Sequence, residues 1–157
     1  MKTILILITI CLFIPYTQQS TIKSSSDNEH VNINITLKNQ TITGGDTSEI
    51  LFDFKPAKGY HVNAIPILSV KIDSNNIVAS TGKLNIPSAK NKEYVDTSKP
   101  VKLPIIFRKD LKNGTHYLKG TLTYFYCSDA EGWCAKYNPG VQKLPADLLL
   151  EFPKFAE

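Results

Sequence analysis

The chain has 157 residues, with 18 basic and 14 acidic side chains and a formal net charge of +4 at pH 7. Its basic residues are lysines spread along the chain, apart from the single Arg108. No basic cluster alternates with aromatic side chains, so the composition argues against a nucleic-acid partner.

Residues 1–20 have the pattern of a secretory signal peptide. Lys2 precedes an apolar run from Ile4 to Ile14, which is too short to span a bilayer as a helix, since this needs about 20 residues. We expect cleavage near Ser20. The bulky Ile10 argues against lipid attachment at Cys11. The protein is therefore predicted to be exported, either periplasmic or secreted, without a lipid tether.

Removing 20 residues from 157 leaves 137, which suits one domain with one core. Lys2 is the only charged residue removed, so the remainder carries +3, one less than the +4 of the whole chain. Residues 21–30 are polar and Ser-rich and are predicted to be a flexible linker. The folded domain is expected to cover residues 31–157.

Most of this domain shows the period-two alternation typical of strands with one buried face. In chain order, we expect strands at residues 31–37, 50–54, 60–64, 68–72, 103–107, 118–126, 141–144 and 148–152. Gly44 to Asp46 and Asn113-Gly114 are turn signals. Pro104 indicates an edge strand or a position whose N–H is not needed.

No stretch of ten residues after the leader has a helical period. Short strands separated by Gly, Pro and Asn turns predict an all-β fold, an antiparallel β-sandwich that is immunoglobulin-like.

Cys127 and Cys134 are the only cysteines after the leader, and in an oxidising compartment they are expected to form a disulfide. An unbroken pleat from Tyr117 to Cys127 puts Cys127 on the face opposite the core. Four side chains then face the core: Leu118, Leu122, Tyr124 and Tyr126. The pair is therefore predicted to be accessible, although one β-bulge would reverse this.

The loop closed by this bond holds eight residues, for which the chain-entropy treatment gives about 2.5 kcal/mol, near the low end for disulfides. Two functions stay open at this point. One is a thiol–disulfide exchange centre, and the other is a secreted interaction domain whose disulfide only braces a hairpin. Spacing alone favours the structural alternative.

Several segments together resemble the amino-terminal periplasmic domain of the DsbD-type thiol:disulfide interchange proteins. These segments are Gly59-Tyr-His-Val-Asn63, Leu103-Pro-Ile105, Leu122-Thr-Tyr124 and Cys127-Ser-Asp-Ala-Glu-Gly-Trp-Cys134. The resemblance covers roughly residues 48–152 and implies an immunoglobulin-like sandwich that carries a redox-active cysteine pair. The cysteine segment is its most specific part.

The resemblance also implies roles for individual residues. Cys134 is the attacking thiol and Cys127 its resolving partner. Tyr94, in the segment from Lys92 to Asp96, matches an aromatic residue of a loop that shields the cysteines. Independently of the resemblance, Trp133 is expected either to crowd the disulfide and dock on a partner or to serve as a half-buried loop anchor, and His61 is a further candidate for partner contact.

This chain departs from the family pattern in three respects. Glu131 adds a residue between the cysteines, and Ala135-Lys136 separates Cys134 from a Tyr-Asn-Pro sequence. His61 and Asn63 stand where the family has tyrosines. The family's membrane and thioredoxin-like domains have no counterpart among these residues.

The expected partners are therefore separate thioredoxin-like proteins, with a membrane electron carrier as a further candidate. The three histidines, His30, His61 and His116, lack ligand spacing, and no Gly-rich phosphate loop occurs. We expect neither a metal nor a small-molecule cofactor.

Overall fold

The computed structural model describes residues 30–39, 42–73, 76–90, 92–112, 115–137 and 148–151. Within these ranges the backbone forms strands and turns and no helix, so the all-β prediction is confirmed. No described helix is long and apolar enough to cross a membrane. The strands are β1 (Val31–Leu37), β2 (Thr47–Pro56), β3 (Tyr60–Val62), β4 (Ser69–Ile72), β5 (Val78–Thr81), β6 (Val101–Phe107), β7 (Thr115–Leu118), β8 (Gly120–Ser128), β9 (Trp133–Tyr137) and β10 (Leu148–Glu151).

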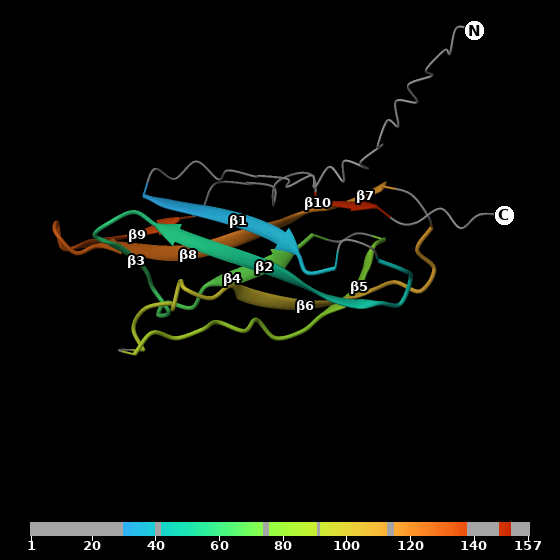
Figure 1. Cartoon of the computed structure of the whole chain (residues 1–157), viewed down its shortest axis with the longest axis horizontal. Coiled ribbons are helices and arrows are strands. Elements are labelled where there is room, and N and C mark those ends of the chain that lie inside the picture. Colours follow the sequence, from blue (N-terminus) through green and yellow to red (C-terminus); the bar gives the residue numbers. More distant parts are fainter. Residues whose placement is uncertain are drawn as a thin grey trace, which may run out of the picture.

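Two antiparallel sheets make up the body of the molecule (Figure 1). The first has the strand order β1-β2-β6-β5. The second is built on β8, which pairs with β3, β4 and β9. A further pair, β7 and β10, continues from the start of β8.

β3 and β4 follow one another along the same edge of β8. Asn63 N donates to Phe125 O at 2.9 Å, and Asp73 N donates to Lys119 O at 3.0 Å. These two acceptors are an even number of residues apart, so both carbonyls point to one edge of β8. The opposite edge pairs with β9. The connection between β3 and β4 contains the exposed Ile65 and Ile67.

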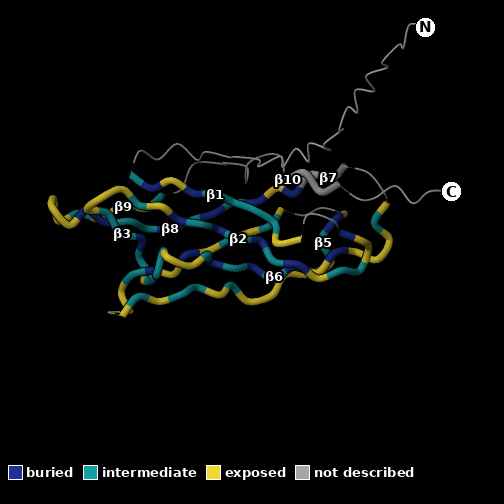
Figure 2. The backbone as a smooth tube through the Cα atoms, in the orientation of Figure 1, coloured by how far each residue is buried: buried dark blue, intermediate teal, exposed yellow. Residues whose placement is uncertain are grey.

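The core lies between the two sheets (Figure 2). Alternate residues of each long strand are buried, as the sequence pattern predicts. Phe54 of β2 meets Tyr124 of β8 edge to face, with ring centroids 5.3 Å apart. This geometry is favourable for aromatic pairs and joins the first sheet to the second. The structure thus confirms a sandwich of two antiparallel sheets, while the immunoglobulin-like topology stays a prediction.

Pro104 lies inside the first sheet, between β2 and β5. The ladder between β5 and β6 ends at the pair Thr81 and Ile105, and Gly82 N donates to Pro104 O at 2.8 Å. The nitrogen of Pro104 points to the same side, past the end of β5, where no N–H is needed. Of the two alternatives predicted for Pro104, a position whose N–H is not needed is therefore correct.

Several expectations need correction. β5 and β9 were not among the predicted strands, and the pleat before Cys127 is interrupted at Lys119. His30 belongs to the folded domain, because its carbonyl accepts a hydrogen bond from Ala57 N at 2.8 Å and its ring stacks on Tyr60. The predicted signal peptide, the linker before His30, the Asn113-Gly114 turn and the strand at 141–144 lie outside the described residues.

Candidate thiol–disulfide site

Cys127 and Cys134 form the predicted disulfide, with an S–S distance of 2.02 Å. They lie directly opposite one another on β8 and β9, with Cα atoms 4.0 Å apart. The four residues from Asp129 to Gly132 connect the strands, and Gly132 N donates to Ser128 O at 3.0 Å. Gly132 has φ +68°, a conformation that a residue with a side chain rarely adopts. The hairpin therefore places the two sulfur atoms face to face.

The disulfide lies on the face of the second sheet that points away from the core. Tyr124 is fully buried on the inner face, and Cys127 follows three residues later on the other face. The break at Lys119 does not change which residues face inward, because Leu118 before it and Leu122 and Tyr124 after it are all buried. The prediction from strand parity is confirmed.

The two cysteines differ in exposure, which corrects the expectation that both are accessible. Cys127 is only 7% exposed, whereas Cys134 is exposed. The reason is their position in the sheet. Cys127 has β3 on one side and β9 on the other, while Cys134 lies on β9, whose only described partner is β8.

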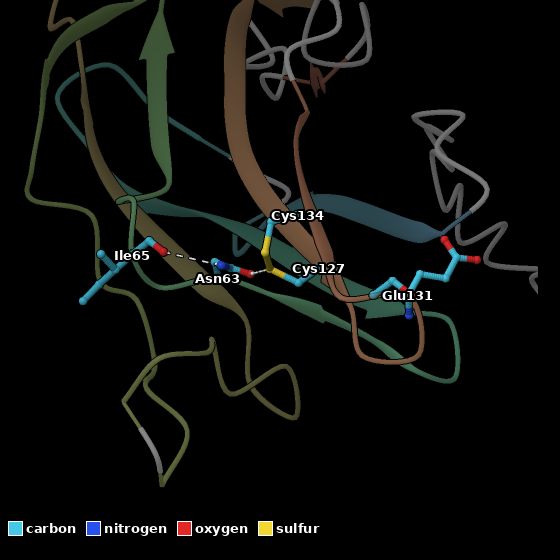
Figure 3. The surroundings of a disulfide bond; sticks show 6 residues. Asn63, Ile65, Cys127, Glu131 and Cys134 are labelled. Atoms are coloured by element: carbon cyan, nitrogen blue, oxygen red, sulfur yellow. Dashed lines mark hydrogen bonds between the residues drawn. A yellow bond between two sulfur atoms is a disulfide. The ribbon is translucent and has the colours of Figure 1, made fainter.

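Asn63, which directly follows β3, contacts the disulfide (Figure 3). Its Oδ1 lies 3.0 Å from Cys127 Sγ, and its Nδ2 donates to the carbonyl of Ile65 at 3.5 Å. Glu131, in the hairpin loop, points away from the disulfide (Figure 3). In the sequence, Asn63 is only the last residue of the segment Gly59-Tyr-His-Val-Asn63 and a departure from the family pattern, and nothing there indicates this contact. Its contact depends on the pairing of β3 with β8, which the local sequence does not reveal.

His61 lies beside the disulfide, since it pairs with Cys127 across β3 and β8. Its Nε2 lies 2.6 Å from Asp129 Oδ2, in the hairpin loop. Its ring stacks on Tyr94 with centroids 4.6 Å apart and an angle of 14°. The structure therefore brings Cys127, Cys134, His61 and Tyr94 together at one end of the second sheet.

The segment that carries Tyr94 is held against the edge of β3. Val95 N donates to Val62 O at 2.9 Å, and Tyr94 forms a bridge with Asn63. The turn that follows is fixed by Asp96. A hydrogen bond from the Ser98 side chain, together with one from Lys99, lowers the pKa of the Asp96 carboxyl. Tyr94 is thereby placed on the same face as His61 and the disulfide.

Trp133 lies on the opposite face from the disulfide, so the expectation that it crowds the sulfur atoms is wrong. Its ring packs near His30, Tyr60 and Tyr126, with centroids 5.7 to 6.1 Å away. Its Nε1 donates to Glu131 Oε2. Adjacent residues of a strand point to opposite faces, so Trp133 cannot share the face of Cys134.

Charges around the disulfide are mixed. Lys136 is exposed and lies two residues after Cys134, on the same face, while Asp129 and Glu131 occupy the hairpin loop. In the described part of the chain, no group of three potential metal ligands comes together.

Comparison of the chain with protein-family models, curated proteins and solved structures gives no match.

Proposed function

We propose that this domain is an exported thiol–disulfide exchange module that uses Cys127 and Cys134. The observation that carries the proposal is the unequal exposure of the pair: Cys134 is exposed on β9, and Cys127 is 7% exposed beneath it. A thiolate from a partner attacks an accessible sulfur more readily than a shielded one. Cys134 is therefore the atom attacked, and Cys127 is the leaving and resolving sulfur.

Reduction by a dithiol partner then proceeds in two balanced steps. A partner thiolate attacks Cys134 Sγ, the S–S bond breaks, and Cys127 leaves as a thiolate that takes a proton. The partner's second thiolate then attacks the partner sulfur that is bonded to Cys134, and Cys134 leaves as a thiolate that takes the second proton. Two electrons and two protons pass from the partner, which becomes a disulfide. The reverse sequence oxidises the pair.

The resemblance to the DsbD-type domain supports the same roles for the two cysteines. It also supports thioredoxin-like proteins as partners, in a periplasmic or extracellular setting, with electrons delivered by a separate protein. Tyr94, His61 and Trp133 are proposed to contact the partner. Trp133 contributes from the opposite face, at the same end of the sheet.

A secreted interaction domain with a structural disulfide is the alternative. The burial of Cys127 favours it, because shielded disulfides exchange slowly. The two functions predict different reduction potentials. An exchange centre requires a potential above about −300 mV, whereas structural disulfides of secreted proteins typically fall below that value.

The first experiment is equilibration of the protein with dithiol redox buffers of known potential, in a Cys11→Ser background that leaves only the pair. We expect a midpoint above about −300 mV. A lower midpoint supports the structural alternative.

The second experiment is mixed-disulfide trapping. In the same Cys11→Ser background, the Cys127→Ser variant is offered a single-cysteine thioredoxin whose sulfur carries a thionitrobenzoate group. The Cys134 thiolate attacks the thioredoxin sulfur and displaces coloured thionitrobenzoate, and the complex persists because no resolving thiol remains. The Cys134→Ser variant is the matched control and should form far less complex. Failure of both variants to form a complex would contradict the proposed exchange.

A further inference from the structure

Asn63 holds its side-chain amide between two elements of the site. Its backbone is fixed on one side by the hydrogen bond to Phe125 O and on the other by the bridge with Tyr94. Its side chain reaches Cys127 Sγ through Oδ1, at 3.0 Å, and the carbonyl of Ile65 through Nδ2, at 3.5 Å (Figure 3). The amide is therefore positioned by the sheet and does not depend on the disulfide for its place.

The orientation of this amide follows from its second contact. If the amide were turned over, Oδ1 would face the carbonyl oxygen of Ile65, and two acceptors would repel each other. With Nδ2 on Ile65, the oxygen faces the sulfur. Cys127 Sγ is thus presented with a hydrogen-bond acceptor.

We infer that Asn63 is a further functional residue of the exchange site, which stabilises the reduced pair by accepting a hydrogen bond from the Cys127 thiol. This inference rests on the proposed function of the same disulfide. A sulfur atom in a disulfide carries no hydrogen, so the 3.0 Å contact is no hydrogen bond in the oxidised form. When a dithiol partner delivers two electrons and two protons, one proton goes to Cys127 Sγ and the other to Cys134. The Cys127 thiol then donates to Asn63 Oδ1.

Because Cys127 is buried, its thiol depends on the Asn63 oxygen as a hydrogen-bond acceptor. Cys127 is only 7% exposed, so a solvent oxygen reaches its sulfur less readily than the neighbouring amide does. The Asn63 oxygen destabilises a Cys127 thiolate, because the partial negative charge of the oxygen repels the negative charge of the sulfur. Asn63 therefore favours the protonated thiol over both the disulfide and the thiolate. Cys134, on the exposed strand, is left as the sulfur that ionises and attacks.

The test compares reduction potentials in the full chain with Cys11→Ser. Asn63→Leu keeps the shape of the side chain and removes the acceptor. We expect the equilibrium constant for reduction to fall about fivefold, which corresponds to about 20 mV. Asn63→Asp keeps an acceptor oxygen, so its potential should equal or exceed that of the parent. Asn85→Leu is the matched control, because Asn85 also forms an isolated bridge, with Lys102, and should leave the potential unchanged.

A second readout does not depend on exchange with a partner. In a Cys11→Ser/Cys134→Ser background, Cys127 is the only thiol, and its S–H stretching band in the infrared should lie at lower frequency with Asn63 than with Asn63→Leu. An unchanged band and an unchanged potential in Asn63→Leu would overturn the role of Asn63, as would an Asn63→Asp variant that behaves like Asn63→Leu. A parent potential below about −300 mV with no trapping would refute the proposed function instead, while the band still decides on Asn63.

Discussion

The two cysteines of one hairpin differ more in their surroundings than their closeness in sequence suggests. Cys127 lies in the central strand of its sheet, under Asn63 and beside His61, whereas Cys134 is exposed on β9. In a disulfide both sulfur atoms share one bond, but nucleophiles reach them from different directions. The order of events in exchange is therefore set by position in the sheet.

This asymmetry predicts a difference in thiol reactivity. In a Cys11→Ser background, the Cys127→Ser variant retains the exposed thiol and the Cys134→Ser variant the buried one. We expect dithionitrobenzoate to modify Cys134 at least about tenfold faster than Cys127, because the reagent must reach the sulfur and the thiolate must be solvated. The release of thionitrobenzoate, followed by absorbance, gives both rates. Equal rates would show that Cys127 is open to solvent and would remove the basis for assigning the roles.

At the scale of the strands, the alternation of buried and exposed residues follows the sequence most closely in the long strands. β6 is the clearest example, because Ile105 is fully buried and its neighbour Ile106 is 43% exposed. Ile105→Ala should lower the free energy of unfolding by about 2–5 kcal/mol, since it removes buried methyl groups and leaves a cavity. Ile106→Ala is the matched control and should cost less than about 1 kcal/mol. Urea unfolding measures both, and similar losses would show that the strand is buried on both faces.

The turn that leads into β2 depends on Asp46. Its Oδ2 accepts hydrogen bonds from Thr43 Oγ1 at 2.6 Å and from Thr43 N at 2.8 Å. These bonds lower the pKa of the Asp46 carboxyl below its ordinary value of 3.8. A carboxyl whose pKa is lower in the folded state stabilises the fold at pH above the unfolded value. That contribution is lost as the pH falls through the folded value.

The Asp46→Asn variant should therefore have a lower urea midpoint than the parent at pH 7. The difference should disappear as the pH falls below the ordinary carboxyl value of 3.8 and then through the folded pKa. Thr43→Val, which removes the hydroxyl donor, should weaken the same pH dependence. A midpoint difference that is equal at pH 7 and at acidic pH would mean that the turn does not depend on the carboxylate charge.

Strands with one buried face could be predicted because apolar and polar side chains alternate along them. β5 could not, since only Val78 among its four residues is partly buried and the others are exposed. For the site, Tyr94 was predicted from the family resemblance and His61 from its own chemistry, and the structure places His61 beside Cys127 with Tyr94 stacked on it. The contact of Asn63 could not be predicted, because it depends on which strand pairs with β8. The error on Trp133 came from treating a chain neighbour of Cys134 as a neighbour in space.

Considered as a whole, the molecule holds its sheets together through a core cluster that does not include the two cysteines. The tip of the β8–β9 hairpin lies at one end of the molecule (Figure 1), while residues such as Phe52, Phe107 and Tyr124 are buried between the sheets. The disulfide joins two residues that β8 and β9 already pair. Its contribution to folding is therefore limited to closing a short loop in the unfolded chain.

Reduction should consequently leave the fold intact. In a Cys11→Ser background, the Cys127→Ser/Cys134→Ser double variant should lose about 2.5 kcal/mol of unfolding free energy, the value expected for a loop of eight residues. Its far-ultraviolet circular dichroism should keep the strand signal of the parent. The parent treated with dithiothreitol is the control, because it lacks the bond but keeps both sulfur atoms. A reduced protein that unfolds at room temperature would show that the bond is required for folding. An exchange module breaks this bond in every catalytic cycle, so its fold must survive reduction. Unfolding on reduction would therefore also contradict the proposed exchange function.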